Sequence, residues 1–144
     1  MRARKALGHT LRTLAQGRLF WMILALGADL VEIARVRALL ERHGERALRR
    51  LFHEEERLYA LRHQDPAPSL AARLAAKEAF QKCWPESLSW KAVWVGMEGR
   101  KPTLRFAPEL EAALREKGLK ALLTLSHERT HALAVVLLVR EASG

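Results

Sequence analysis

Cysteine and long apolar runs are scarce in this sequence, and each shortage excludes a class of protein. The one cysteine among 144 residues, Cys83, has no partner for an intrachain disulfide and cannot build a cysteine-based zinc site. We interpret it as a small buried apolar residue. No apolar run reaches the ~18 residues of a membrane-spanning helix. The apolar stretch 19–26 is followed by Asp29 and Glu32, without a cleavage signal, so a cytoplasmic protein is expected.

Several common catalytic motifs are also missing. The sequence contains no Walker A loop, no G-x-G-x-x-G, no G-x-S-x-G and no H-E-x-x-H. Hydrophobic residues make up 49% and charged residues 28%, which is typical of a folded globular protein and not of a disordered one. A chain of 144 residues is typical of one domain.

Acidic residues are outnumbered by basic ones, 16 to 25, which gives a net charge of +9. This excess favours an anionic partner, which could be nucleic acid, a phosphate-rich ligand or an acidic protein. Charge alone does not choose among the three. The first 21 residues hold five basic and no acidic residues: Arg2, Arg4, Lys5, Arg12 and Arg18.

Residues 1–21 differ from the rest, and we treat them as a basic extension to a domain over 22–144. Three interpretations are open: a start codon placed too early, a surface tail, or an arm that binds nucleic acid or membrane. We favour the first, because Met22 directly precedes a well-defined apolar strand pattern, and the true start is then Met22 and not Met1.

The hydrophobic periodicity predicts helices first and antiparallel strands later, which indicates an α+β domain. The alanine- and leucine-rich helix 70–83 has the clearest pattern, and Ser69 is its expected N-cap. We expect Leu58 and Leu61 to face inward. The expected helices are 31–42, 45–51, 54–62, 70–83 and 108–117, and the expected strands are 22–28, 89–97, 102–106, 121–126 and 131–139.

An aspartate stands at the carboxyl end of the first expected strand. Asp29 follows Gly27 by two residues, and Arg35 comes six residues later. A carboxylate at a strand end is well placed to reach a pocket. Taken alone, however, Asp29 is equally typical of a helix cap, and Arg35 of a solvated arginine.

The helix 70–83 carries a second group of charged residues. Glu78 and Lys82 are four apart and share a face, with Arg73 close to that side. Taken alone, this is an ordinary helical salt bridge. Ala75 and Ala79 lie on the same face, and their small side chains would let another group approach closely. A carboxylate between basic residues suits a phosphate–metal site, because the carboxylate binds the cation and the basic residues bind the phosphates.

The two features together resemble a known family. G-x-D-x-x-x-x-x-R at 27–35 and K-E-A-x-x-K at 77–82 resemble the two signature motifs of the 4′-phosphopantetheinyl transferase superfamily. The run A-A-K-E-A-F, the G-x-K-P element at 99–102, the late L-S-H-E and the final V-R-E are similar to its small, bacterial carrier-protein-synthase branch. The resemblance covers about residues 22–141. One departure is 83–89, which stands where the family usually has a glycine-rich segment.

This resemblance implies a fold, a cofactor and a set of site residues. Helices would pack on a small antiparallel sheet, and chains of this length would form homotrimers with active sites between subunits. Asp29 and Glu78 would hold Mg²⁺ and, with Lys82, form the catalytic group. The residues implied to contact coenzyme A are Arg73, Lys77, Lys82, Lys101 and His127.

The resemblance also implies a reaction. A serine hydroxyl of apo-acyl carrier protein would attack the β-phosphate of coenzyme A, and adenosine 3′,5′-bisphosphate would leave. Glu78, or a metal-bound water that it orients, is the expected acceptor of the serine proton. Arg35 and Arg42 would dock the acidic carrier protein, which explains the basic balance without nucleic acid or membrane. Such an enzyme serves fatty acid biosynthesis.

Two alternatives come from other classes. A basic RNA-binding module would explain the net charge, but the sequence shows neither aromatic pairs on a strand platform nor a known RNA-binding motif. A catalytically dead trimeric scaffold of the same fold is the other, and the presence of both Asp29 and Glu78 argues against it.

Overall fold

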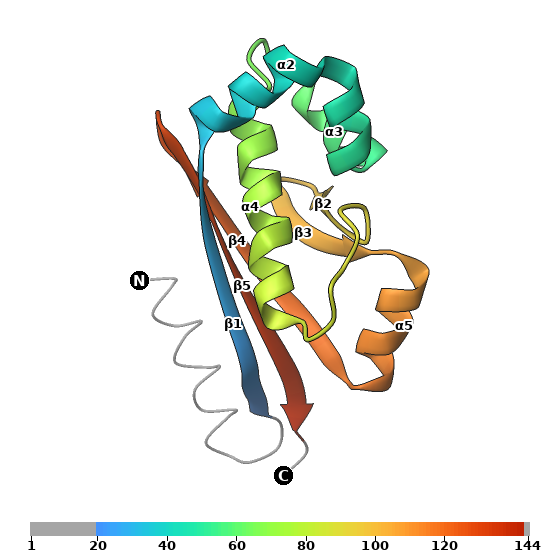
Figure 1. Ribbon diagram of the computed structural model, residues 1–144. Coiled ribbons are helices and arrows are strands. Elements are labelled where there is room, and N and C mark those ends of the chain that lie inside the picture. The colour runs from blue at the N-terminus through green and yellow to red at the C-terminus, as the bar shows by residue number, and fades with distance from the viewer. Residues whose placement is uncertain (1–19, 143–144) are drawn as a thin grey trace.

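The computed structural model describes residues 20–142, so the predictions for residues 1–19 lie outside the described part of the chain. Figure 1 labels the helices and strands in chain order. They are β1 (Phe20–Glu32), α2 (Ile33–Leu51), α3 (Glu54–Ala60), α4 (Ala67–Cys83), β2 (Val93–Glu98), β3 (Lys101–Phe106), α5 (Pro108–Glu116), β4 (Leu119–His127) and β5 (His131–Ala142).

The strands form two antiparallel sheets, and α4 packs on the larger one. That sheet has the order β1-β5-β4, while β2 and β3 form a separate hairpin. Helix α4 lies along one face of the three-stranded sheet, with α2 and α3 gathered at its amino-terminal end (Figure 1). The predicted α+β class is confirmed.

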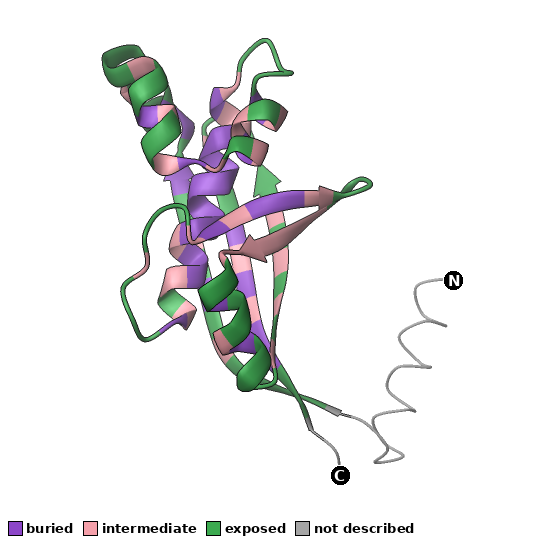
Figure 2. Cartoon of the chain, turned by 90° about the vertical axis from the view of Figure 1, so that its right-hand side faces the viewer, coloured by how far each residue is buried: buried purple, intermediate pink, exposed green. Residues whose placement is uncertain are grey.

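Helix α4 is the centre of the core because it is covered on nearly every side. The run from Leu70 to Lys77 is buried throughout, as are Ala79 and Phe80. Figure 2 shows the buried colour gathered at the centre of the molecule, with the exposed colour prominent on the outer helices. Alanines at most of the contact positions allow the sheet and the hairpin to approach the helix axis closely.

Several element boundaries differ from the predicted ones. Strand β1 continues to Glu32, so the first helix begins at Ile33. Gly44, at φ 51°, was expected to end the first helix. It instead forms a kink between the two expected helices, which are joined in α2. Helix α4 begins at Ala67, whose amide donates to Asp65 Oδ1 at 3.2 Å, so Ser69 lies inside the helix and does not cap it.

The predicted inward face of the third helix is wrong. Leu58 and Leu61 are each 59% exposed, whereas α3 buries Glu56 and Ala60. The cause is the acidic start of α3, where Glu56 pairs with a lysine of α4 and accepts a hydrogen bond from an amide of β2. Cys83 is half-buried and free, close to its expected state. No helix in residues 20–142 is long and apolar enough to cross a membrane.

Candidate active site

The candidate site forms where β1 passes closest to α4. Gly27 lies against the backbone of Ala79, and Asp29 follows two residues later on the same face of β1. Glu78 precedes Ala79 on the helix. The glycine therefore has no side chain to hold strand and helix apart, and the Asp29 and Glu78 carboxyl groups come together.

One ammonium group lies beside the two carboxyl groups. Lys82 Nζ donates to the Ala28 carbonyl oxygen at 2.6 Å and to Asp29 Oδ1 at 3.4 Å. Asp29 Oδ2 is buried and accepts no hydrogen bond from the described residues. The structure thus brings together the three residues predicted to be catalytic, Asp29, Glu78 and Lys82.

The electrostatics of Glu78 reflect this crowding. The pKa of Glu78 is raised to about 7, first by burial and then by the hydrogen bond and negative charge of Asp29, against the opposing charges of Arg35 and Lys82. Asp29 Oδ2 is a bare acceptor unless Glu78 carries a proton that the two carboxyl groups share. Either a proton or a cation would relieve the repulsion.

The donor set fits a hard divalent cation. Mg²⁺ prefers oxygen ligands and keeps several waters, so one or two carboxylates and the phosphates of a substrate complete its shell. Asp29 and Glu78 supply two carboxylates, and the orphaned Oδ2 atom supplies a free lone pair. Among the described residues no three His, Cys, Asp or Glu side chains gather in one place, which disfavours an all-protein metal cage.

A groove of about 460 Å³ opens beside Glu78, between α2 and α4. Arg35 and Arg42, the predicted docking residues, both line it, together with Trp90 from the segment before β2. Apolar side chains form much of the remaining lining. The predicted docking arginines and the predicted metal ligand therefore share one continuous surface.

Two residues predicted to contact coenzyme A are buried instead. Lys77 is 5% exposed and hydrogen-bonded to two main-chain carbonyls and to Glu56. Arg73 is 4% exposed, lies 4.1 Å above the Tyr59 ring and donates to the Ser69 carbonyl. Burial lowers the pKa of both. Neither has the exposure that a phosphate contact needs in this chain, so the geometry argues for structural roles.

Lys101 and His127 lie away from the carboxylate pair. Lys101 begins β3 and lines a separate groove of about 880 Å³ between β3, α5 and β4, which also contains Arg105 and Lys120. His127 ends β4 opposite Ala132, which pairs with Val31 on its other side. It therefore shares the sheet face of Asp29, but two strand spacings, about 10 Å, separate it from β1.

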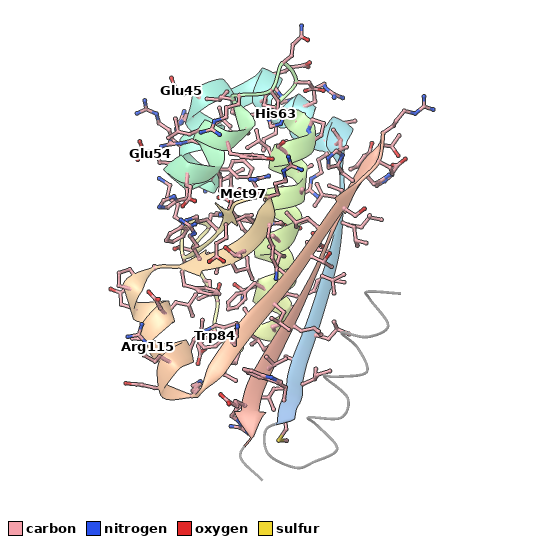
Figure 3. All side chains as sticks on the ribbon, turned by 180° about the vertical axis from the view of Figure 1, so that it is seen from behind. Glu45, Glu54, His63, Trp84, Met97 and Arg115 are labelled. Carbon is pink, nitrogen blue, oxygen red and sulfur yellow. The ribbon has the colours of Figure 1, made fainter. Side chains whose placement is uncertain are left out.

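Sequence reasoning missed Gln81, which holds the segment that departs from the family pattern. Its Nε2 donates to the Glu86 carbonyl and its Oε1 accepts from the Leu88 amide, both at 2.8 Å. These two hydrogen bonds from one side-chain amide hold residues 84–88 in place, and this segment contains no glycine. Figure 3 shows Trp84 at the carboxyl end of α4, far from Glu45 and Glu54 at the other end of the molecule.

Sequence reasoning also missed Glu56, a fully buried carboxylate. A signal was available: in H-E-E-E, His53 and Glu56 have the spacing of a capping box, in which the N-cap and the fourth residue bond to each other's backbone. The structure contains this box at the start of α3. The capping-box pattern predicts that the Glu56 side chain is ordered. It does not predict which distant residues Glu56 contacts.

Comparison with known proteins agrees with this fold and site. The model of the 4′-phosphopantetheinyl transferase superfamily matches residues 25–136. A holo-[acyl-carrier-protein] synthase of Thermus thermophilus is 76% identical over 123 residues, which are 85% of this chain and 98% of the relative.

Two solved structures are similar in fold. The holo-[acyl-carrier-protein] synthase of Neisseria meningitidis has a TM-score of 0.73 and 31% identity, covering 81% of this chain and 98% of that one. The Bacillus anthracis enzyme, in complex with coenzyme A (3′,5′-ADP), has a TM-score of 0.67 and 26% identity, covering 83% and 98%.

The helix-on-sheet fold and the facing carboxyl groups define a phosphoryl-transfer type of site. The chain belongs to the 4′-phosphopantetheinyl transferase superfamily and, within it, to the holo-[acyl-carrier-protein] synthases. It is a transferase, as the resemblance implied.

Proposed function

We propose that this enzyme moves the 4′-phosphopantetheine arm of coenzyme A to a serine of apo-acyl carrier protein, at a Mg²⁺ site formed by Asp29 and Glu78. The observation that carries the proposal is the facing carboxyl pair, with its unpaired Asp29 Oδ2 and the raised pKa of Glu78. The relatives' names supply the substrate class. Adenosine 3′,5′-bisphosphate is the expected second product.

The side chains of the site divide the chemistry of the transfer. When bound, Mg²⁺ supplies positive charge that offsets the charge developing on the phosphoryl oxygens. Lys82, whose side chain is 55% exposed, is free to turn from Asp29 toward a phosphate oxygen. Glu78, or a metal-bound water that it orients, is the proposed proton acceptor for the serine hydroxyl.

The groove beside Glu78 is the proposed approach of the carrier protein. Acyl carrier proteins are acidic, and Arg35 and Arg42 place positive charge on the groove next to the carboxylate pair. Opposite charges on the two proteins would speed their encounter and make it sensitive to salt. The same charges explain the basic composition without a nucleic acid partner. A cytoplasmic location and a role in fatty acid biosynthesis remain predictions.

We further propose the homotrimer expected from the family. The sheet face turned away from α4 carries exposed apolar side chains in matched rows, and contiguous exposed apolar surface of this kind marks interaction sites. Leu26 pairs through Leu137 with Leu122, and Leu30 lies beside Leu133. The exposed fractions of Leu26 and Leu30 are 64% and 61%. Copies of this chain packed through these rows would bury them.

The trimer would also give a role to Lys101 and His127. A single chain does not bring either residue to the Asp29–Glu78 pair. In an assembly with sites between subunits, they could reach coenzyme A from a neighbouring copy. Lys101 shares its groove with Arg105, Arg115 and Lys120, a concentration of positive charge that suits the phosphates of the nucleotide end.

The test is transfer from coenzyme A to an acidic apo carrier protein, followed by mass spectrometry of the carrier. The parent chain and Glu78→Gln are compared with and without Mg²⁺. We expect a mass gain of one phosphopantetheine group that requires both Mg²⁺ and Glu78. Glu54→Gln, an exposed change of the same chemistry at the start of α3, serves as the matched control and should keep full activity.

The outcomes separate the alternatives. No mass gain with several carrier proteins, from a well-folded parent, would contradict the transferase proposal and favour a scaffold. Salt-dependent retention of RNA by the same preparation, without release of adenosine 3′,5′-bisphosphate, would favour the RNA-binding alternative. Transfer that persists after removal of all divalent cations would contradict the proposed metal site alone.

A further inference from the structure

A buried ion pair lies on the far side of α4 from Asp29. Lys77 Nζ is 2.7 Å from Glu56 Oε1, and their side chains are 4% and 0% exposed. Lys77 directly precedes Glu78, so the two side chains leave the helix about 100° apart, one toward the core and one toward the candidate site.

Both members of the pair have all their main hydrogen-bonding capacity occupied. The Lys77 ammonium group also donates to the carbonyl oxygens of Trp90, at 2.9 Å, and Val93, at 2.5 Å. Glu56 Oε1 accepts from the His53 amide and Oε2 from the Val95 amide, at 3.0 and 2.9 Å. The pair therefore joins the start of α3, helix α4, strand β2 and the segment before β2.

Net stabilisation is a weak explanation for such a pair. Removing two charges from water costs about as much as their attraction returns, and apolar residues of similar volume often serve as well. The pair instead fixes the positions of the backbone groups around it, because each hydrogen bond holds a backbone atom at a set distance and angle.

Trp90 is the element of the site that depends on this pair. Its carbonyl oxygen is held by Lys77, while the residue, 39% exposed, lines the groove that contains Glu78 and Arg35. The segment from 84 to 92 contains no helix or strand; Gln81 holds it at 86 and 88, and the Ala107 amide donates to the Ala92 carbonyl at its end. Within residues 84–92, its backbone is tied by Lys77 and by a turn in which the Ala92 amide donates to the Ser89 carbonyl.

We propose that Lys77 and Glu56 are positioning residues that hold Trp90 as a fixed wall of the groove beside Glu78, and so determine how the protein substrate fits there. The proposal rests on the proposed function, since it assigns the groove to the carrier protein. The carrier protein is favoured over coenzyme A as the molecule on Trp90 because the charged residues that share this groove are the docking arginines, Arg35 and Arg42.

The main variant removes both charges together, so that neither is left buried without its partner. In Glu56→Gln/Lys77→Met, the glutamine oxygen still accepts one of the two amides, and the methionine fills the volume of the lysine stem. Trp90→Ala removes the wall itself at an exposed position. The parent, the double variant, Trp90→Ala and the triple variant form a cycle that reports coupling.

We expect the double variant and Trp90→Ala each to raise KM for the carrier protein about tenfold, a change of one decade in affinity. The values of kcat and of KM for coenzyme A should stay within about twofold of the parent. The triple variant should be no worse than Trp90→Ala, because the pair acts through that residue. A purely structural role would lower kcat with the folded fraction and leave KM unchanged.

Three results would overturn the proposal: an unchanged KM for the carrier protein in Trp90→Ala, a KM change confined to coenzyme A, or fully additive effects in the triple variant. If the double variant does not fold, Glu56→Gln alone and Trp90→Ala still test it. Binding of the apo carrier protein, measured by calorimetry without turnover, keeps this test separate: an inactive parent contradicts the proposed function, whereas equal binding by parent and Trp90→Ala contradicts the wall.

Discussion

A methyl group placed on Gly27 would lie 2.0 Å from the carbonyl oxygen of Ala79. This contact sets the spacing between β1 and α4 and thereby the distance between Asp29 and Glu78, their neighbours in sequence. The glycine of the first motif therefore allows the strand to lie directly against the helix backbone at Ala79, next to Glu78 of the second motif.

Gly27→Ala should consequently damage the site as well as the fold. Over-packing of this kind costs about 1–3 kcal/mol of unfolding free energy, and the displaced strand should weaken Mg²⁺ binding in the variant that remains folded. Gly99→Ala is the control, since its φ of 63° makes alanine strained while no atom lies within 4 Å. It should lower the melting temperature but leave metal affinity unchanged; equal metal affinity in both variants would contradict the argument.

Mg²⁺ binding should strengthen as pH rises through neutrality. The pKa of Glu78 is raised to about 7 in the metal-free protein, above its ordinary value of 4.5, so a proton competes with the metal below that pH. Calorimetric titrations at pH 6, 7 and 8 should show the weakest binding at pH 6, with proton release on binding. A pH-independent affinity in the parent would refute the assignment.

The same shift has a consequence for stability without metal. A carboxyl group whose pKa is higher in the folded protein contributes stability that is fully present below pH 4.5 and is lost as pH rises through about 7. The metal-free parent should therefore lose stability over this window relative to Glu78→Gln, and saturating Mg²⁺ should restore it. Thermal unfolding of both proteins at pH 5 and pH 8 measures the difference.

His53 should act in the opposite direction. Burial lowers the pKa of His53 from 6.5, against the raising effect of nearby glutamates, and its Nδ1 accepts from the Glu55 amide at 3.1 Å. A lowered pKa gives stability that is present above pH 6.5 and lost as the pH falls below it. The difference in melting temperature between the parent and His53→Asn, which keeps an N-cap acceptor, should shrink from pH 8 to pH 5.5. A constant difference would contradict this.

The outer face of the three-stranded sheet should control assembly. Leu26→Asp places a charge on an apolar row and should convert the proposed trimer to monomer, with loss of transfer activity. Leu58→Asp is the control, because Leu58 is equally exposed on α3, away from the sheet. Sedimentation velocity distinguishes the species; a parent that is monomeric at assay concentration would refute the proposed assembly.

Removal of the groove arginines should weaken use of the carrier protein. Arg35→Ala should raise KM for the carrier protein roughly tenfold at low salt, equivalent to about 1.4 kcal/mol, and should flatten its dependence on salt. Arg62→Ala, an exposed arginine just after α3 that does not line this groove, should change neither value. An equal response of the two variants would show that only net charge matters.

The sequence by itself determined the fold class, the course of most elements and the two carboxylates of the site. Periodicity predicted a counterpart for each of the nine helices and strands in residues 20–142, because local propensities and turns agree with the fold. Asp29 and Glu78 could be found because both motifs are local in sequence. The boundaries at Glu32 and Ala67 were missed because a strand extended by pairing with β5 and a helix begun by Asp65 depend on contacts that periodicity does not contain.

The tertiary structure alone decided which way the charged residues of α4 face. The sequence places Arg73, Lys77, Glu78 and Lys82 on one short helix, and all were expected near the phosphates. Because α4 is buried on nearly every side, its pattern has no solvent face to orient it. Only the packing of α3 and β2 gave Lys77 a buried carboxylate, Glu56, and only the close crossing of β1 gave Glu78 a partner in Asp29.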